Sequence, residues 1–224
     1  MPRLVIASGN RHKVGELARA VHGVEALAGV EVLAASALGP LPTIVEDRET
    51  FAGNATVKAL GFAAWLRGRG EPGETLVLAD DSGLCVDALD GAPGVYSARF
   101  AGADATDADN NRALVRALEA LGLDASPSHY VCALALGRVD AVPLAGANDE
   151  GVCIFTGRWD GEARTVARGD GGFGYDPHVW LDGRARTVAE LRPEEKGARS
   201  HRGAAIVGLL DALPRLLGGA ASAG

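Results

Sequence analysis

The sequence predicts an α/β fold built around a mixed β-sheet. The chain has 224 residues, of which 47% are hydrophobic and 23% are charged, which is typical of a folded protein that buries its own core. Its first half alternates short apolar runs with segments of helical periodicity, the pattern of parallel strands joined by helices. Its second half holds three strand-like runs in series, and such a series favours antiparallel pairing.

The first strand is predicted at residues 3–8, RLVIAS, because this apolar run ends at the turn signal Gly9-Asn10. A helix should follow directly, since Val14, Leu17 and Val21 recur at helical spacing. VEVLAAS, residues 30–36, is the second predicted strand.

The next predicted helix begins after Thr50, a favoured N-cap residue, and continues to about residue 69. ETLVLAD, residues 74–80, is the third predicted strand, and we expect it to end at the paired acids Asp80 and Asp81. Residues 86–105 are rich in Gly, Ala and Asp and predict a long ordered loop. Thr106, with an acid three residues later, predicts a capping box for a third helix.

Three strand-like runs follow, at residues 129–139, 141–147 and 151–159. Residues 168–178 predict a Gly-rich loop, and Ser200 should cap a final helix. The sequence shows no internal repeat and no composition break. It therefore predicts one domain over residues 1–217, with a disordered tail over residues 218–224.

Charge and cysteine content narrow the function classes. The formal net charge is -7, whereas a non-specific nucleic-acid binder is usually basic. The N-terminal apolar run is too short for a signal peptide, and no run is long enough to span a membrane. Cys85, Cys132 and Cys153 form no CxxC pair and are odd in number. We therefore expect a cytoplasmic protein that binds neither nucleic acid nor membrane.

Two segments hold groups suited to a polyphosphate. SGNRHK, residues 8–13, falls where the first strand turns into a helix, and it is either a helix-capping turn or a phosphate site completed by Lys13. Asp80 and Asp81 are either a solvated turn or ligands for a hard cation such as Mg²⁺.

A third acidic segment, residues 45–59, adds Glu46, Asp47 and Glu49. It also places Asn54 and Lys58 four residues apart, on one helix face. The segment is either an acidic surface loop followed by an ordinary helix, or part of the same site.

Two further segments hold groups suited to a nucleobase. GGFGYDP, residues 171–177, presents two aromatic rings on a Gly-rich backbone, and such rings stack on bases. EEKGARSHRG, residues 194–203, gathers Lys196, His201 and Arg202 near the start of a helix. The alternatives are a self-packed surface loop and a capped surface helix.

These motifs occur in an order that resembles the inosine triphosphate pyrophosphatase family, which comprises the XTP/dITP diphosphatases of noncanonical purine nucleotides. The matching segments are SGN-x-x-K, TF-x-x-NA-x-x-KA, ADDSGL, GAPGVYSARF, GGFGYDP and SHRG, and the resemblance runs from about Leu4 to Leu213. It implies two α/β lobes around a long mixed sheet, with the active site in the cleft between them. It also implies a homodimer and a Mg²⁺-dependent hydrolysis of ITP, dITP and XTP to the nucleoside monophosphate and pyrophosphate, which cleanses the nucleotide pool.

The resemblance also implies roles for individual residues. Asp81 would be the general base, and Glu46 and Asp81 would be the metal ligands, although Asp47 could replace Glu46 and Asp80 could be a further ligand. The remaining expected substrate-binding residues are Ser8, Gly9, Asn10, Arg11, His12, Lys13, Asn54, Lys58, Ser82, Phe173, Gly174, Tyr175, Asp176, Lys196, His201 and Arg202.

Selectivity has a predicted cause on the base side. Arg202 and His201 are donors suited to the 6-oxo group of hypoxanthine and xanthine, and a 6-amino group would leave buried donors unpaired at a cost of roughly 1–3 kcal/mol each. Two other functions remain open: the same fold acting on other modified nucleotides, and a nucleotide sensor without catalysis. The intact Lys13, Glu46 and Asp81 favour an enzyme.

Overall fold

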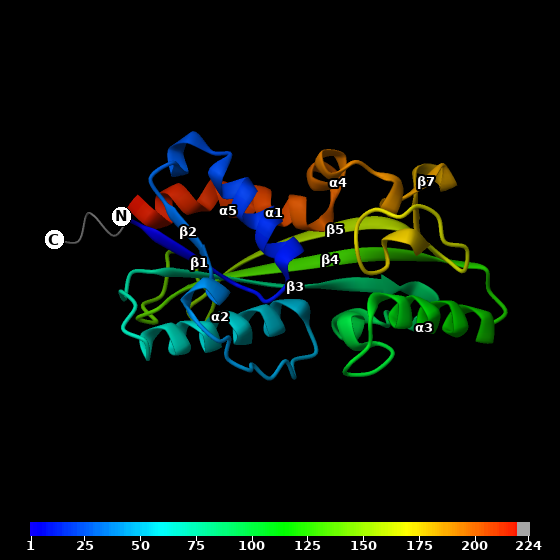
Figure 1. Cartoon of the computed structure of the whole chain (residues 1–224), viewed down its shortest axis with the longest axis horizontal. Helices are drawn as coiled ribbons and strands as arrows, with labels where there is room; N and C mark the ends of the chain where they lie inside the picture. The colour runs from blue at the N-terminus through cyan, green and yellow to red at the C-terminus, as the bar shows by residue number, and fades with distance from the viewer. Residues whose placement is uncertain (219–224) are drawn as a thin grey trace. The chain divides into compact units, whose positions relative to one another are not determined.

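A mixed sheet organises the fold, as the sequence predicts. The computed structural model describes residues 1–218 (Figure 1). The strands are β1 (Arg3–Ala7), β2 (Glu31–Ala34), β3 (Leu76–Val86), β4 (Ala125–Arg138), β5 (Cys153–Arg164), β6 (Val179–Leu181) and β7 (Arg186–Thr187). They form one sheet in the order β2-β1-β3-β4-β5-β6-β7. β1 pairs in parallel with β2 and β3, whereas β6 pairs antiparallel with β5 and β7.

The helices are α1 (Arg11–His22), α2 (Phe51–Arg67), α3 (Asp107–Ala120), α4 (Pro193–Arg199) and α5 (His201–Gly218). The chain divides into two compact units. Unit 1 comprises residues 1–81 and 133–156 and the part of α5 from Ala205, and unit 2 comprises residues 82–132 and 157–204.

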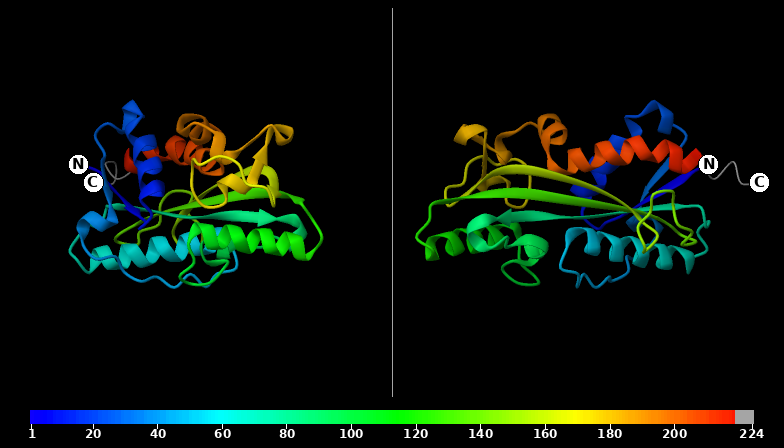
Figure 2. Two further views of the ribbon diagram at one scale, coloured as in Figure 1. Left: turned by 45° about the vertical axis from the view of Figure 1, so that its right-hand side comes forward. Right: turned by 180° about the vertical axis from the view of Figure 1, so that it is seen from behind.

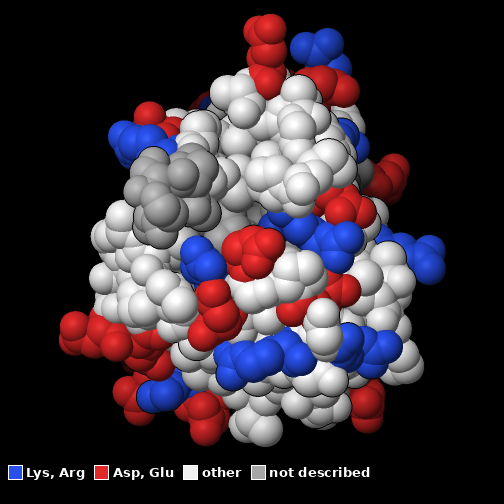
Figure 3. All heavy atoms as spheres, turned by 90° about the vertical axis from the view of Figure 1, so that its left-hand side faces the viewer, with Lys and Arg blue, Asp and Glu red and all other residues white. Residues whose placement is uncertain are grey.

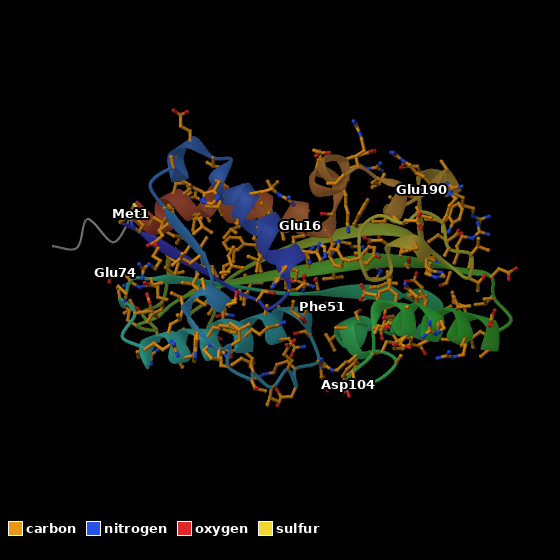
Figure 4. The ribbon with its side chains drawn as sticks, viewed as in Figure 1. Met1, Glu16, Phe51, Glu74, Asp104 and Glu190 are labelled. Atoms are coloured by element: carbon orange, nitrogen blue, oxygen red, sulfur yellow. The ribbon has the colours of Figure 1, made fainter. Side chains whose placement is uncertain are left out.

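Unit 1 has helices on both faces of its strands. Figures 1 and 2 show α2 on one face and α1 and α5 on the other. Alternate residues of β1 and β3, such as Val5 and Val77, pack with the buried residues of α2, including Ala59 and Leu66. Phe51, labelled in Figure 4, is the first residue of α2. Its predicted N-cap is confirmed, because the Thr50 side chain accepts a hydrogen bond from the backbone N–H of Gly53.

Unit 2 encloses a second hydrophobic core, in which Leu84 and Val86 of β3 pack with Leu114 and Leu118 of α3. The predicted capping box is present at the start of α3, between Thr106 and Asp109. A second capping box, which the sequence analysis missed, joins Thr187 to Glu190, the residue labelled in Figure 4.

The third predicted strand does not end at the paired acids, and that prediction was wrong. β3 continues without a break to Val86, and Asp80 and Asp81 are buried within it, only 3% and 7% exposed. Successive strand residues face opposite sides of the sheet, so the two carboxylates point apart. Each also contacts a lysine, which offsets the cost of burying the charge.

Two other local predictions need correction. Residues 141–147 form no strand, because Pro143 has no N–H to donate and Ala141 adopts a left-handed φ of 61°. The segment before the final helix contains the short helix α4, which the sequence analysis missed. Of the predicted tail, Gly218 is the last residue of α5, and residues 219–224 lie outside the described residues.

Surface charge, hydropathy and cysteine state complete the description of the chain. Figure 3 shows one face on which acidic and basic side chains are interspersed. No helix among residues 1–218 is long and apolar enough to span a membrane. Cys85, Cys132 and Cys153, which all lie in the described part of the chain, form no disulfide, and burial raises the pKa of Cys85 and Cys153.

Candidate active site

Two buried ion pairs define the part of the candidate site in unit 1. The Lys13 ammonium on α1 contacts Asp80 Oδ1, and the Lys58 ammonium on α2 lies 3.2 Å from Asp81 Oδ1. Because α1 and α2 cover opposite faces of the strands, each helix supplies one lysine to one of the two neighbouring carboxylates (Figure 1). All four side chains belong to the predicted site.

Lys58 also contacts the acidic loop before α2. Its Nζ lies 2.9 Å from Glu46 Oε2, so one ammonium joins Glu46 to Asp81. Asp47, the alternative ligand, is exposed, whereas Glu46 is partly buried. The contact between Lys58 and Glu46 therefore favours Glu46 over Asp47 as the metal ligand next to Asp81. Asn54 is fully buried and holds the loop by exchanging two hydrogen bonds, of 3.0 and 3.2 Å, with the backbone of Arg48.

The electrostatics of Asp81 suit a proton acceptor. Burial raises the pKa of its carboxyl, although the charges of Lys58 and Lys13 oppose the shift. The pKa of Lys58 is also raised: its burial acts against the charged form, but the charge of Asp81 and the hydrogen bond to Glu46 outweigh it. Asp81 Oδ2 is buried and has no hydrogen-bond partner. A hard divalent cation would satisfy that oxygen, with Glu46 as the second carboxylate.

The predicted phosphate turn is a tightly hydrogen-bonded N-cap. Asn10 Oδ1 accepts from the backbone N–H groups of His12 and Lys13, at 2.9 and 3.2 Å, and Ser8 Oγ accepts from the N–H of Asn10. The helix-capping alternative is therefore realised. It does not exclude phosphate binding, because Lys13 remains at the end of the turn. Gly9 and Arg11 are exposed neighbours within this turn.

In unit 2, the buried carboxylate of Asp176 accepts hydrogen bonds that hold the Gly-rich loop. It is 3% exposed, and its Oδ2 accepts from the Phe173 N–H, at 2.8 Å, and from the Lys196 ammonium. The same ammonium lies 4.3 Å from the centre of the Phe173 ring. Phe173, Asp176 and Lys196, all three predicted to bind substrate, are thus in direct contact.

Arg202 and His201 open α5 beside this loop. Arg202 is 2% exposed, donates to Ser82 Oγ at 2.9 Å and lies 5.9 Å from the Phe173 ring centre. The ring of His201 stacks on that of Tyr130 at 4.8 Å. Ser200, the predicted cap, accepts from the N–H of Gly203 at 3.0 Å. The structure therefore brings Ser82 and Arg202 together and places His201 against Tyr130.

Hydrogen bonds between side chains and backbone groups fix the rest of the Gly-rich loop. Gly174 accepts from Asn111 and donates to Asp107, both on α3, and the Tyr175 hydroxyl donates to the Ser97 carbonyl at 2.8 Å. No sequence pattern points to Ser97, Asp107 or Asn111, because small polar residues in a loop and on a helix surface give no signal of a distant contact.

Comparisons with known proteins identify the family of the chain. The Ham1 family matches residues 4–212. The chain belongs to the Ham1 family. It is 40% identical to the dITP/XTP pyrophosphatase of Geobacillus kaustophilus, over 98% of each chain. It is 42% identical to the dITP/XTP pyrophosphatase of Erwinia tasmaniensis, over 95% of each.

Solved Ham1-family structures share the fold. The HAM1 protein from Coxiella burnetii is 36% identical and matches with a TM-score of 0.79, over 96% of this chain and 100% of that one. A nucleoside-triphosphatase / dITP/XTP pyrophosphatase from Mycobacterium abscessus is also 36% identical and has a TM-score of 0.66, over 93% and 98%. The α/β fold with a mixed sheet and the family predicted from the motifs are thereby confirmed.

Proposed function

We propose that this chain is a nucleoside triphosphate pyrophosphatase that hydrolyses noncanonical purine nucleotides of the dITP, ITP and XTP class. The observation that carries this proposal is the 40–42% identity to dITP/XTP pyrophosphatases over nearly the full length of both chains. The contacts described above support it. The lysines and carboxylates of unit 1 suit a polyphosphate and its metal, whereas the aromatic ring and buried donors of unit 2 suit a purine.

The phosphate-side roles follow from charge. Lys13 and Lys58 are paired with internal carboxylates, so they offer positive charge to a polyphosphate without leaving buried charge uncompensated. Glu46 and Asp81 would hold the divalent cation, for which we propose Mg²⁺. No group of three or more His, Cys, Asp or Glu converges among residues 1–218, so water and phosphate oxygens would complete its shell. Bound there, the cation would offset phosphate charge.

Asp81 is the proposed general base. Water forms a bond from its oxygen to phosphorus, the P–O bond that bridges the α- and β-phosphates breaks, and the proton of the water passes to the Asp81 carboxylate. The products are the nucleoside monophosphate and pyrophosphate. Burial shifts the pKa of Asp81 upward and favours its uptake of a proton, whereas a cation bound to the same carboxylate would oppose that shift.

Selectivity is assigned to unit 2. Phe173 would stack on the purine, and the guanidinium of Arg202 would donate to the 6-oxo group. The 6-amino group of ATP presents hydrogens at that place, so it offers no acceptor to the buried Arg202 guanidinium. Lys196 and Asp176 fix the position of Phe173 through the contacts described above.

The test is a panel of ITP, dITP, XTP, GTP, ATP and dUTP, incubated with the protein and Mg²⁺, with monophosphate and pyrophosphate both measured. We expect ITP, dITP and XTP to be cleaved far faster than ATP, and Asp81→Asn to lower kcat by about 10²–10⁴-fold. A preference for another nucleotide would favour a retuned enzyme. Binding of ITP without cleavage by the wild type would favour a sensor.

Assembly and location are two further proposals. We propose a homodimer, because the resemblance implies one, and a cytoplasmic location, because nucleotide pools are the substrate. Sedimentation of the purified protein tests the dimer, which predicts twice the 22.9 kDa mass of the chain.

A further inference from the structure

The strand β4 contributes one side chain, Tyr130, to the base-side cluster, although none of the predicted binding residues lies on that strand. Tyr130 is 6% exposed. Its hydroxyl donates to Asp176 Oδ1 at 3.1 Å, and its ring stacks on the ring of His201 with centres 4.8 Å apart and planes at 11°. One side chain thus contacts both the Gly-rich loop and the start of α5, and all of these residues lie within unit 2.

We infer that Tyr130 is a positioning residue that holds the Gly-rich loop and His201 in the arrangement that recognises the base. This inference rests on the proposed function and deepens it, because it names what fixes the specificity groups before substrate arrives. Tyr130 touches no reacting atom in this scheme; it acts through Asp176 and His201.

The hydroxyl has a defined task at Asp176. The two oxygens of this buried carboxylate are shared among three donors: Oδ2 accepts from Phe173 and Lys196, and Oδ1 accepts from Tyr130. Burial and the neighbouring Asp176 charge hold the pKa of the Tyr130 phenol well above its usual range, so the group remains a donor. Without it, Oδ1 would be a buried acceptor lacking a protein donor, and the Asp176 carboxylate would lose one of the three hydrogen bonds that orient it.

The ring has a separate task at His201. The Tyr130 ring stacks on the His201 imidazole with centres 4.8 Å apart, and this contact limits rotation of the imidazole. On its other contact, the Tyr130 ring packs against Trp159 with ring centres 6.4 Å apart. Preorganised groups bind a ligand more tightly because less ordering remains to be done on binding. Loss of Tyr130 should therefore weaken substrate binding more than it slows the chemical step.

Three variants separate these tasks from a general loss of stability. Tyr130→Phe removes only the hydroxyl, and Tyr130→Leu also removes the stacked ring. Ser126→Ala is the matched control, since it deletes a buried hydroxyl from the same strand, one that accepts from the N–H of Ala88 at 3.0 Å and lies outside the site. For each protein, KM and kcat for ITP, the Kd for IMP by calorimetry and the melting temperature are measured.

We expect Tyr130→Phe to raise both KM and the Kd for IMP by roughly five- to tenfold with kcat within about twofold, and Tyr130→Leu to raise both further. Ser126→Ala should lower the melting temperature and leave KM and Kd unchanged. Tyr130→Phe with wild-type KM and Kd overturns the inference while the proposed function stands, and so does a Ser126→Ala increase as large as that of Tyr130→Phe. A wild type that neither cleaves ITP nor binds IMP overturns both.

Discussion

Replacing Lys58 by Met tests the electrostatic account of unit 1. Methionine preserves the length of the buried stem and deletes the charge that joins Asp81 to Glu46. The side chains of Lys58 and Asp81 are only 14% and 9% exposed, so the pair is poorly screened by solvent. Removing one partner of a buried pair costs about 3–5 kcal/mol, because the other charge is left uncompensated.

The expected cost here is smaller, because Asp81 can take up a proton. We expect a loss of about 2–3 kcal/mol of unfolding free energy at pH 8, or about 4–12 °C in Tm for a protein of this size. A carboxyl whose folded-state pKa lies above its unfolded value destabilises the fold when ionised. That destabilisation is absent below the unfolded pKa, near 3.9, and grows as pH rises through the folded pKa. The difference between variant and wild type should therefore shrink from pH 8 to pH 5.

Thermal melts at both pH values, read by circular dichroism, measure the effect. Lys58→Met combined with Asp81→Asn should recover most of the lost stability, since the more deeply buried of the two carboxylates that Lys58 compensates is then no longer charged. Arg112→Met is the matched control: it breaks an exposed pair with Asp109 and should cost less than about 1 kcal/mol. A Lys58→Met protein that melts like the wild type at pH 8, or a double variant no more stable than the single one, would refute the reasoning.

Three other outcomes follow from the site. Arg202→Ala should lower the ratio of kcat/KM for ITP over ATP by about tenfold or more; an unchanged ratio would remove Arg202 from base selection. Gly172→Ala should destabilise the protein and raise KM, because φ is 74° and a Cβ would lie 2.0 Å from a carboxylate oxygen of the same loop. Gly183→Ala, with a φ of 65° but open space, controls for backbone strain alone, and equal effects would count against the clash. Glu46→Gln should raise the Mg²⁺ concentration needed for half-maximal rate, whereas Asp47→Asn should not; the reverse result would make Asp47 the ligand.

Sequence patterns predicted the architecture well, because periodicity and caps are local signals. Asn10, Thr50 and the Thr106–Asp109 box begin helices where the residue types indicated. The prediction failed at β3, since a pair of adjacent acids signals a turn when each is considered without its partner. Lys58 lies on another element, and nothing in the local pattern shows that it compensates Asp81.

The residues of the candidate site also fall into two groups: those that a sequence motif reveals and those that only the folded structure reveals. Motif order identified the groups that carry distinctive chemistry, such as Lys13, Asp81 and Arg202. It did not identify Tyr130, because an aromatic residue in an apolar strand has the appearance of an ordinary core residue. Its hydroxyl gains a role only through Asp176, 46 residues further along the chain. Contacts at such separation are set by topology, which periodicity does not encode.

The unbroken course of β3 limits how this protein can evolve. Along a strand, the side of the sheet that a residue faces depends on whether its position is odd or even, so inserting or deleting a single residue within 76–86 would exchange the faces of the residues that follow. Asp81 would then turn away from Lys58, and Ser82 from Arg202, although every amino acid were retained. The number of residues in β3 is therefore more strictly constrained in evolution than the identity of each residue. Insertions and deletions are better tolerated at residues 139–152, which form neither helix nor strand.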